Sequence, residues 1–434
     1  MRKRIIAALA LIMTFSASSC GNLGMPDPGT ITHKENDGKS PVTTDDSSTP
    51  DEDTTDGEDS VEVVPEMYSP VDETQDYVKA TLHNMTLEEK VGQLFFVRPD
   101  ALETDYDNKT VNDDTIGGVT FVDKMMTEAL GKYHVGGIYL YEKNISNETD
   151  LRKFTVDLQD KSELPLFIGV QELGGDYAPI ANNVNFNVQL FKNMNELGKD
   201  GATNKAKHVG STIGEYLASY GVNIDFAPVA DVSVDGEKVS EWNFSADATV
   251  VASLVDAEID GFHEQSVMTA VGHFPGYADG SADKKKFVLD VNTWENLVAS
   301  DLLPYVNILH KTDMLLVGHV ELPEVITDGT PTSMSKEFIE GKIRDELGYN
   351  GVVITDTMSD TAVMNKYSQS ECAVAAINAG ADIILTPYDL DEAYNAVIKA
   401  VNDGTISESR IDESVTRVLT LKAKRGLFGT GAVE

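Results

Sequence analysis

Basic residues are few in this chain, and their scarcity argues against several classes of function. The sequence holds 34 Lys and Arg against 72 Asp and Glu, a formal net charge of −38. Such a charge argues against nucleic acid and anionic lipid as partners, because both present dense negative charge. Cofactor signatures are also missing: no G-x-G-x-x-G follows the first predicted strand, and there is no P-loop. The eight histidines are scattered without the spacing of metal ligands, so we expect neither a metal site nor a cofactor. They include His208, His263, His273, His310 and His319.

Cysteine is equally rare, with only Cys20 and Cys372 in the chain. Cys20 follows a basic segment (Arg2-Lys3-Arg4), an apolar run from Ile5 to Phe15 and the small residues Ala17-Ser18-Ser19. The apolar run is too short for a stable transmembrane helix, and the whole of residues 1–20 resembles a bacterial lipoprotein signal that ends in a lipidated cysteine. An ordinary cleaved signal with an incidental cysteine is the alternative. With Cys20 acylated, Cys372 has no intramolecular partner, so we expect no disulfide and a buried, inert thiol.

Residues 21–70 are expected to form a disordered acidic tether. Within residues 21–66, thirteen acidic side chains stand against two lysines, and large apolar residues are few. Such a segment buries too little apolar surface to offset the entropy lost on ordering. We therefore expect the protein to be held at the membrane by the lipid on Cys20, facing outside the cytoplasm.

From residue 76 to residue 428 the chain alternates short apolar runs with amphipathic stretches. There are eight such runs: residues 91–97, 136–141, 166–170, 223–227, 268–271, 313–317, 351–355 and 383–386. The stretches between them have helical periodicity, for example residues 391–401. Eight strand–helix units predict an α/β protein with a single TIM-type (β/α)8 barrel. A doubly wound open sheet is the alternative, and the missing glycine-rich fingerprint weakens it.

Two of the predicted strands end in polar residues that suit catalysis. The run at residues 351–355 leads into Asp356, and the run at residues 268–271 leads into Gly272 and His273. In a barrel, catalytic side chains project from the C-terminal ends of strands, so we expect Asp356 and His273 to share one site. Capping of the following helix is the alternative role for Asp356, because Asp is common at helix N-termini.

Longer motifs resemble the N-terminal barrel of family 3 glycoside hydrolases, in that family's order and over essentially all of residues 76–428. The motifs are Met85–Leu94, Val135–Ile138, Phe226–Val232, His273–Gly276, Asp301–Tyr305, Gly318–Val320 and Leu347–Asp356. Because the chain ends soon after Arg417–Lys422, we expect the form without a second domain, similar to single-domain bacterial β-N-acetylglucosaminidases. The resemblance implies a carbohydrate substrate, a peptidoglycan fragment or another glycan, and a retaining mechanism with Asp356 as the nucleophile.

The chain departs from this family at the position of the proton donor. In the single-domain members a His paired with an Asp donates the proton, within the motif K-H-F-P-G-H-G-x4-D-x-H. Asp283 matches the Asp, but Lys285 stands in the place of the His, and Gly272 replaces the sugar-binding Lys. A lysine with a reference pKa of about 10.4 is a reluctant acid near neutral pH. Glu172 and Tyr277 are alternative donors.

The positions that grip the sugar in this family are also altered. Alignment of the family's D-Q-E-G-G-R-V-x-R segment puts Gln171 at a hydroxyl-binding Asp and Pro179 at a binding Arg, and Trp242 replaces a further Arg. The expected substrate-binding residues are Gln171, Glu172, Trp242, His273 and His319. Trp242 offers a face on which a sugar ring can stack, and His319 is equally compatible with a packed barrel residue.

Loss of several hydrogen-bonding clamps changes or abolishes the ligand of a polar site. The sequence therefore leaves two functions open. We expect a glycosidase of the β-N-acetylhexosaminidase type, with Asp356, Asp283 and Lys285 as its catalytic residues. A degenerate, non-catalytic carbohydrate-binding or scaffold lipoprotein on the same fold is the alternative.

Overall fold

The computed structural model describes residues 70–234, 239–277 and 285–428. The predicted signal, Cys20, nearly all of the predicted tether and Asp283 lie outside these residues. In the part of the chain that the structure describes, none of the helices combines the length and the apolar character needed to cross a membrane.

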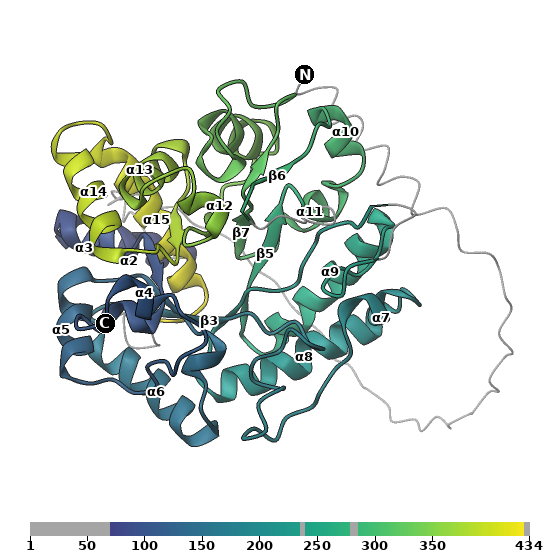
Figure 1. Ribbon diagram of the computed structural model, residues 1–434, viewed down its shortest axis with the longest axis horizontal. Coiled ribbons are helices and arrows are strands. Elements are labelled where there is room, and N and C mark those ends of the chain that lie inside the picture. The colour runs from purple at the N-terminus through teal and green to yellow at the C-terminus, as the bar shows by residue number, and fades with distance from the viewer. Residues whose placement is uncertain (1–69, 235–238, 278–284, 429–434) are drawn as a thin grey trace, which may run out of the picture. The chain divides into compact units, whose positions relative to one another are not determined.

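Eight parallel strands close into a barrel in the order β1-β10-β9-β7-β5-β4-β3-β2 (Figure 1). The strands are β1 (Phe95–Val97), β2 (Gly137–Tyr139), β3 (Phe167–Val170), β4 (Ile224–Asp225), β5 (Met268–Phe274), β7 (Met314–Val317), β9 (Val352–Thr357) and β10 (Ile383–Leu385). Because β1 pairs with both β2 and β10, the sheet has no free edge. The predicted (β/α)8 barrel is confirmed, and the open sheet is excluded. A separate parallel pair, β6 (Val288–Leu289) with β8 (Val320–Glu321), was not predicted.

Helices surround the barrel (Figure 1). The α-helices are α2 (Pro70–Asn84), α3 (Leu87–Gly92), α4 (Asn108–Val111), α5 (Lys124–Tyr133), α6 (Glu148–Lys161), α7 (Met194–Gly198), α8 (Thr203–Ser219), α9 (Ala248–Glu264), α10 (Trp294–Ala299), α11 (Leu303–Ile308), α12 (Thr361–Met364), α13 (Gln369–Ala379), α14 (Leu390–Asn402) and α15 (Glu408–Lys424). Short 3₁₀ segments are η1 (Pro99–Leu102), η2 (Glu142–Asn144) and η3 (Thr332–Met334), and η4 (Glu337–Glu346) is a π-helix. Helix α14 contains the helix predicted at residues 391–401. The rings of Tyr77 and Phe428 lie 4.9 Å apart, so α2 contacts the segment after α15.

The prediction that the first strand begins at residue 91 is wrong. Residues 91 and 92 belong to α3, which starts with a capping box. The Thr86 hydroxyl accepts from the Glu89 N–H at 3.2 Å, and the Glu89 carboxylate accepts from the Thr86 N–H at 2.6 Å. Because these two bonds satisfy N–H groups at the helix start, they favour a helix over a strand across the first part of the apolar run.

Side chains alternate between the two faces of each barrel strand. In β9, Val352 and Ile354 pack inside the barrel, whereas Val353 packs against the outer helices. The two-residue period of a strand puts Asp356 on the inner side, where the strand ends. In β3, Phe167 packs inside the barrel, and the same two-residue period puts Gln171, just after the strand, on the inner side as well. Strand periodicity thus aims both polar side chains into the mouth of the barrel.

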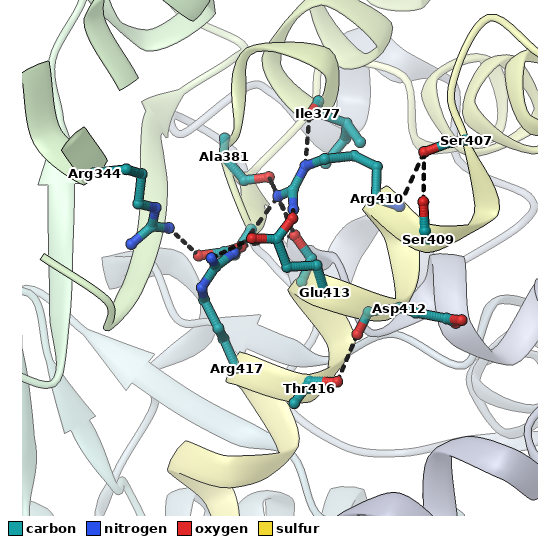
Figure 2. Close-up of polar contacts among 12 residues, drawn as sticks. Arg344, Ile377, Ala381, Ser407, Ser409, Arg410, Asp412, Glu413, Thr416 and Arg417 are labelled. Carbon is teal, nitrogen blue, oxygen red and sulfur yellow. Dashed lines mark hydrogen bonds and ion pairs between the residues drawn. The ribbon is translucent and has the colours of Figure 1, made fainter. Parts of the chain in front are cut away.

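The opposite end of the barrel is held by a buried carboxylate, that of Asp382 just before β10. Three guanidinium groups bind its oxygens: Arg344 at 2.7 Å, Arg410 at 3.2 Å and Arg417 at 3.0 Å. Figure 2 shows these arginines converging from η4 and α15. The Oδ2 atom of Asp382, which binds Arg344, also accepts from the N–H of Val353 at 2.9 Å. Asp382 therefore ties the last strand to its neighbour β9 and to the last helix.

Cys372 is buried in α13, as predicted. Burial raises the pKa of its thiol to about 12. The thiolate is the reactive form of cysteine, so this side chain is inert at neutral pH.

Candidate active site

A cavity of about 310 Å³ lies at the C-terminal ends of the barrel strands. Its lining comes from residues after β3 and β7, from the ends of β5 and β9, and from the connections between them. The structure brings five of the predicted site residues together in this lining: Gln171, Trp242, His273, His319 and Asp356.

Asp356 is held by two hydrogen bonds at the tip of β9. The Tyr277 hydroxyl donates to Oδ2 at 2.6 Å, and the Thr357 N–H donates to Oδ1 at 2.7 Å. Burial by itself raises the pKa of Asp356, but the positive charge of His273 and these hydrogen bonds outweigh it, so the pKa lies below its usual value. Asp356 is therefore an oriented carboxylate that stays ionised over the whole neutral range. It begins no helix, so the N-cap alternative fails; Asp360 is the residue that caps α12.

His273 is paired with a buried aspartate that the sequence reasoning missed. Its Nδ1 lies 2.9 Å from Oδ2 of Asp231, whose Oδ1 accepts from the His273 N–H at 2.9 Å and from the Tyr305 hydroxyl at 2.8 Å. Burial lowers the pKa of His273, but the Asp231 carboxylate outweighs this and raises it to about 9. His273 is therefore a cation, and with Nδ1 bound to Asp231 its Nε2 is the nitrogen that can donate to a ligand. Asp231 is the next-to-last residue of the Phe226–Val232 motif, shortly after a predicted strand, and that position was the available signal.

His319 is both a packed barrel residue and part of the cavity wall. Its side chain is only 2% exposed. The ring nitrogens lie 2.7 Å from the Ser333 hydroxyl (Nδ1) and 3.1 Å from the Thr357 carbonyl (Nε2). A carbonyl only accepts, so Nε2 carries a hydrogen. The His319 N–H also donates to the Tyr277 hydroxyl at 2.8 Å, which fixes the tyrosine that holds Asp356.

Aromatic rings form the rest of the wall. Trp242 packs edge-on against Tyr177, with ring centroids 5.3 Å apart, and Phe287 contributes a further ring. The ring of Tyr277 stacks on His273 at 4.8 Å. Such a wall suits the apolar face of a sugar ring.

Glu172 does not line this cavity. Its side chain is fully buried, and its carboxylate accepts from the N–H groups of Ile180 and Ala181, both at 2.9 Å, and from the Tyr216 hydroxyl at 2.8 Å. Burial raises the pKa of Glu172 to about 7. The structure thus places Glu172 behind the site, where it holds residues 180 and 181 in position. The prediction that it binds substrate has no support from this placement.

The region of the predicted proton donor is described only in part. Asp283 lies outside the described residues, so its pairing with Lys285 stays a prediction. Lys285 is exposed and is not in the cavity wall, where its neighbour Lys286 is found together with Asp360. The Lys285 carbonyl accepts from the Asn365 side chain at 3.2 Å, which holds its backbone beside α12.

By the family resemblance Gly272 stands at the position of a sugar-binding lysine, and the structure shows that a side chain there would be crowded. A Cβ atom added to Gly272 would lie 2.6 Å from the Cδ2 atom of Leu316. A lysine at this position would therefore require Leu316 to move or to be replaced. The glycine at position 272 is therefore matched to the leucine at position 316, which packs inside the barrel.

The profile of the glycosyl hydrolase family 3 N-terminal domain matches residues 86–421. The chain belongs to glycosyl hydrolase family 3. This family 3 chain is 28% identical over 351 residues to Beta-hexosaminidase A of Pseudoalteromonas piscicida, an alignment that covers 73% of the chain and 58% of that protein. It is also 28% identical over 305 residues to Beta-hexosaminidase LpqI of Mycobacterium tuberculosis, covering 67% of the chain and 76% of that protein.

A solved structure of a family 3 beta-N-acetylglucosaminidase from Paenibacillus sp. resembles this family 3 chain with a TM-score of 0.69 at 30% identity. The similarity covers 81% of the chain and 64% of that structure. The chain spans less than two thirds of the Pseudoalteromonas protein and of the Beta-N-acetylglucosaminidase/beta-glucosidase of Cellulomonas fimi, 58% and 60% of their lengths.

Proposed function

We propose that this protein is a retaining glycosidase of the β-N-acetylhexosaminidase type, which cleaves terminal β-linked N-acetylglucosamine or a related hexoside. The observation that carries the proposal is Asp356, an ionised and oriented carboxylate in the mouth of the barrel. A retaining glycosidase needs such a carboxylate to attack the anomeric carbon. The cavity of about 310 Å³ lies at the small end of the range for ligand pockets and suits one sugar ring. The names of the relatives support an N-acetylhexoside as substrate.

In the proposed reaction one oxygen of Asp356 attacks the anomeric carbon while the bond to the leaving oxygen breaks. The leaving oxygen takes a proton, and a covalent glycosyl ester remains on Asp356. Water then attacks the same carbon, loses a proton and frees the carboxylate with net retention. His273, held as a cation by Asp231, donates from Nε2 to a sugar oxygen, and Trp242 packs against the ring.

The source of the leaving-group proton sets the rate of this proposed reaction. By family resemblance the donor position holds Lys285, whose partner is Asp283. An ammonium group with a reference pKa of about 10.4 gives up its proton reluctantly. Loss of a matched acid/base group typically costs about 10²- to 10⁴-fold in rate. Glycosides with good leaving groups need little protonation and escape most of this cost.

Hydrolysis of a series of aryl β-N-acetylglucosaminides tests the proposal. We expect measurable turnover that rises steeply as the pKa of the leaving phenol falls, and Asp356→Asn should lower it by about 10⁴-fold or more. The change removes the nucleophile but keeps nearly the same shape, so the circular dichroism spectrum should not change. Asp160→Asn, on an exposed part of α6, is the matched control and should keep full activity.

A non-catalytic carbohydrate-binding role is the second candidate, and the departures at Lys285, Gln171 and Pro179 favour it. The hydrolysis assay, combined with a measurement of sugar binding, separates the two candidates. If the wild-type chain hydrolyses none of the aryl glycosides, yet binds N-acetylglucosamine oligosaccharides with an affinity that Asp356→Asn leaves unchanged, the enzymatic proposal fails.

The proposal extends to the location of the protein. A lipid on Cys20 and an acidic tether before residue 70 would hold the barrel outside the cytoplasm. The support is the sequence of residues 1–70, which lie almost wholly outside the described structure.

A further inference from the structure

Three potential metal ligands converge at the opposite end of the barrel from Asp356. Glu89 lies in α3 before β1, His134 lies between α5 and β2, and Glu163 lies between α6 and β3, so all three precede the strands. One ligand atom of each lies within 4.8 Å of the other two. The Nδ1 atom of His134 is 3.4 Å from an oxygen of Glu163.

The cluster borders a cavity of about 300 Å³, which gives room for water beside the ligands. Among the described residues that line it, none is a lysine or an arginine: Thr81, Asn84, Met85, Glu89, Gln93, Leu130, His134, Ser162, Glu163 and Leu164. Two carboxylates and an imidazole thus meet in a hollow whose wall supplies no permanent positive charge. A bound cation would balance this charge.

Two of the three ligands are positioned by hydrogen bonds. The His134 carbonyl accepts from the Gln93 amide at 2.8 Å, and the other end of that amide accepts from the buried Lys422 at 2.7 Å. His134 also has the left-handed conformation, with φ of 49°, at the end of α5. Glu89 uses one oxygen in its capping box, which leaves the other for a ligand. Glu163 is exposed and can swing toward the other two.

We propose that Glu89, His134 and Glu163 bind one Zn²⁺ ion, with water from the cavity completing the coordination. Imidazole nitrogen with carboxylate oxygen is a ligand set that suits Zn²⁺, whereas Ca²⁺ and Mg²⁺ prefer oxygen alone. With bonds of about 2.0–2.2 Å, ligand atoms around tetrahedral zinc lie roughly 3.3 Å apart. The His134–Glu163 pair already has about this spacing, so binding requires mainly side-chain rotation at Glu89. The ion would join α3 to the segments that lead into β2 and β3.

Titration of the metal-stripped full chain with Zn²⁺, followed by calorimetry, tests the site. We expect one tight Zn²⁺ per chain, and a loss of affinity of at least about tenfold in Glu163→Gln and in His134→Asn. Asparagine tolerates the left-handed conformation, so the second variant should keep the fold. Glu128→Gln, on the exposed face of α5, removes the same charge nearby and should leave the affinity unchanged.

A second probe, Co²⁺, distinguishes metal bound at the proposed site from metal bound weakly to the many other acidic groups. Co²⁺ in a site with a histidine ligand should give visible absorption bands, and these should disappear in His134→Asn. Absence of tight Zn²⁺ binding in the wild-type chain would overturn the proposal. So would equal affinity in the wild type and in Glu163→Gln, or bands that survive the loss of His134.

Discussion

At the scale of single residues, Tyr277 and His273 favour the ionised form of Asp356. The tyrosine hydroxyl donates to the carboxylate and accepts from the His319 N–H, so its hydrogen points at Asp356. The histidine is kept positive by Asp231. Both effects favour the ionised carboxylate, and they outweigh the burial that opposes it.

Tyr277→Phe should therefore raise the pKa of Asp356. The acid limb of the profile of kcat/KM against pH reports this group in the free enzyme, and it should move to higher pH. Tyr177→Phe, which changes another ring of the cavity wall, should alter KM but leave the acid limb in place. An acid limb that does not move in Tyr277→Phe would show that this hydrogen bond does not set the ionisation of Asp356.

The sequence identified the residues at strand ends better than their partners. Asp356 and His273 could be predicted to share a site because both follow barrel strands, and Gln171 could be added only through the family resemblance. The pairing of Asp231 with His273 and the burial of Glu172 could not be predicted, because both depend on segments distant in the chain. The cluster of Glu89, His134 and Glu163 could not be predicted either, because the three residues come from different strand–helix units.

At the scale of elements, local patterns predicted the eight barrel strands and failed where a competing local signal was present. The capping box at Thr86 and Glu89 turned the start of the first apolar run into α3. The pair β6 and β8 was missed because neither strand lies in one of the eight apolar runs that were interpreted as strands.

The last helix depends on a contact between elements that the sequence does not reveal. Asp382→Asn removes the negative charge that Arg344, Arg410 and Arg417 share. The three guanidinium groups then lie close together with no carboxylate between them. We expect a loss of about 3–5 kcal/mol in the free energy of unfolding, measured by urea denaturation. Asp403→Asn, in the turn after α14, is the control and should change it little. A loss below about 1 kcal/mol for Asp382→Asn would show that the cluster does not hold α15 to the barrel.

At the scale of the whole molecule, the net charge of −38 gives no electrostatic attraction to an anionic membrane. Attachment would then rest on the lipid at Cys20 alone. Cys20→Ala should move the protein from the membrane fraction to the soluble or secreted fraction, as followed by immunoblotting. Cys372→Ala, at a buried position, is the control for loss of a thiol and should stay in the membrane fraction. Unchanged partitioning of Cys20→Ala would contradict the anchor.

Trapping a covalent bond between Asp356 and the sugar tests the proposed mechanism. A fluorinated N-acetylglucosaminyl fluoride, which forms the glycosyl ester quickly and releases it slowly, should raise the intact mass of the wild-type chain by one glycosyl unit. Peptide mapping should place the label on Asp356, and Asp356→Asn should stay unlabelled. A label on another residue, or turnover of aryl glycosides with no label at all, would contradict the account.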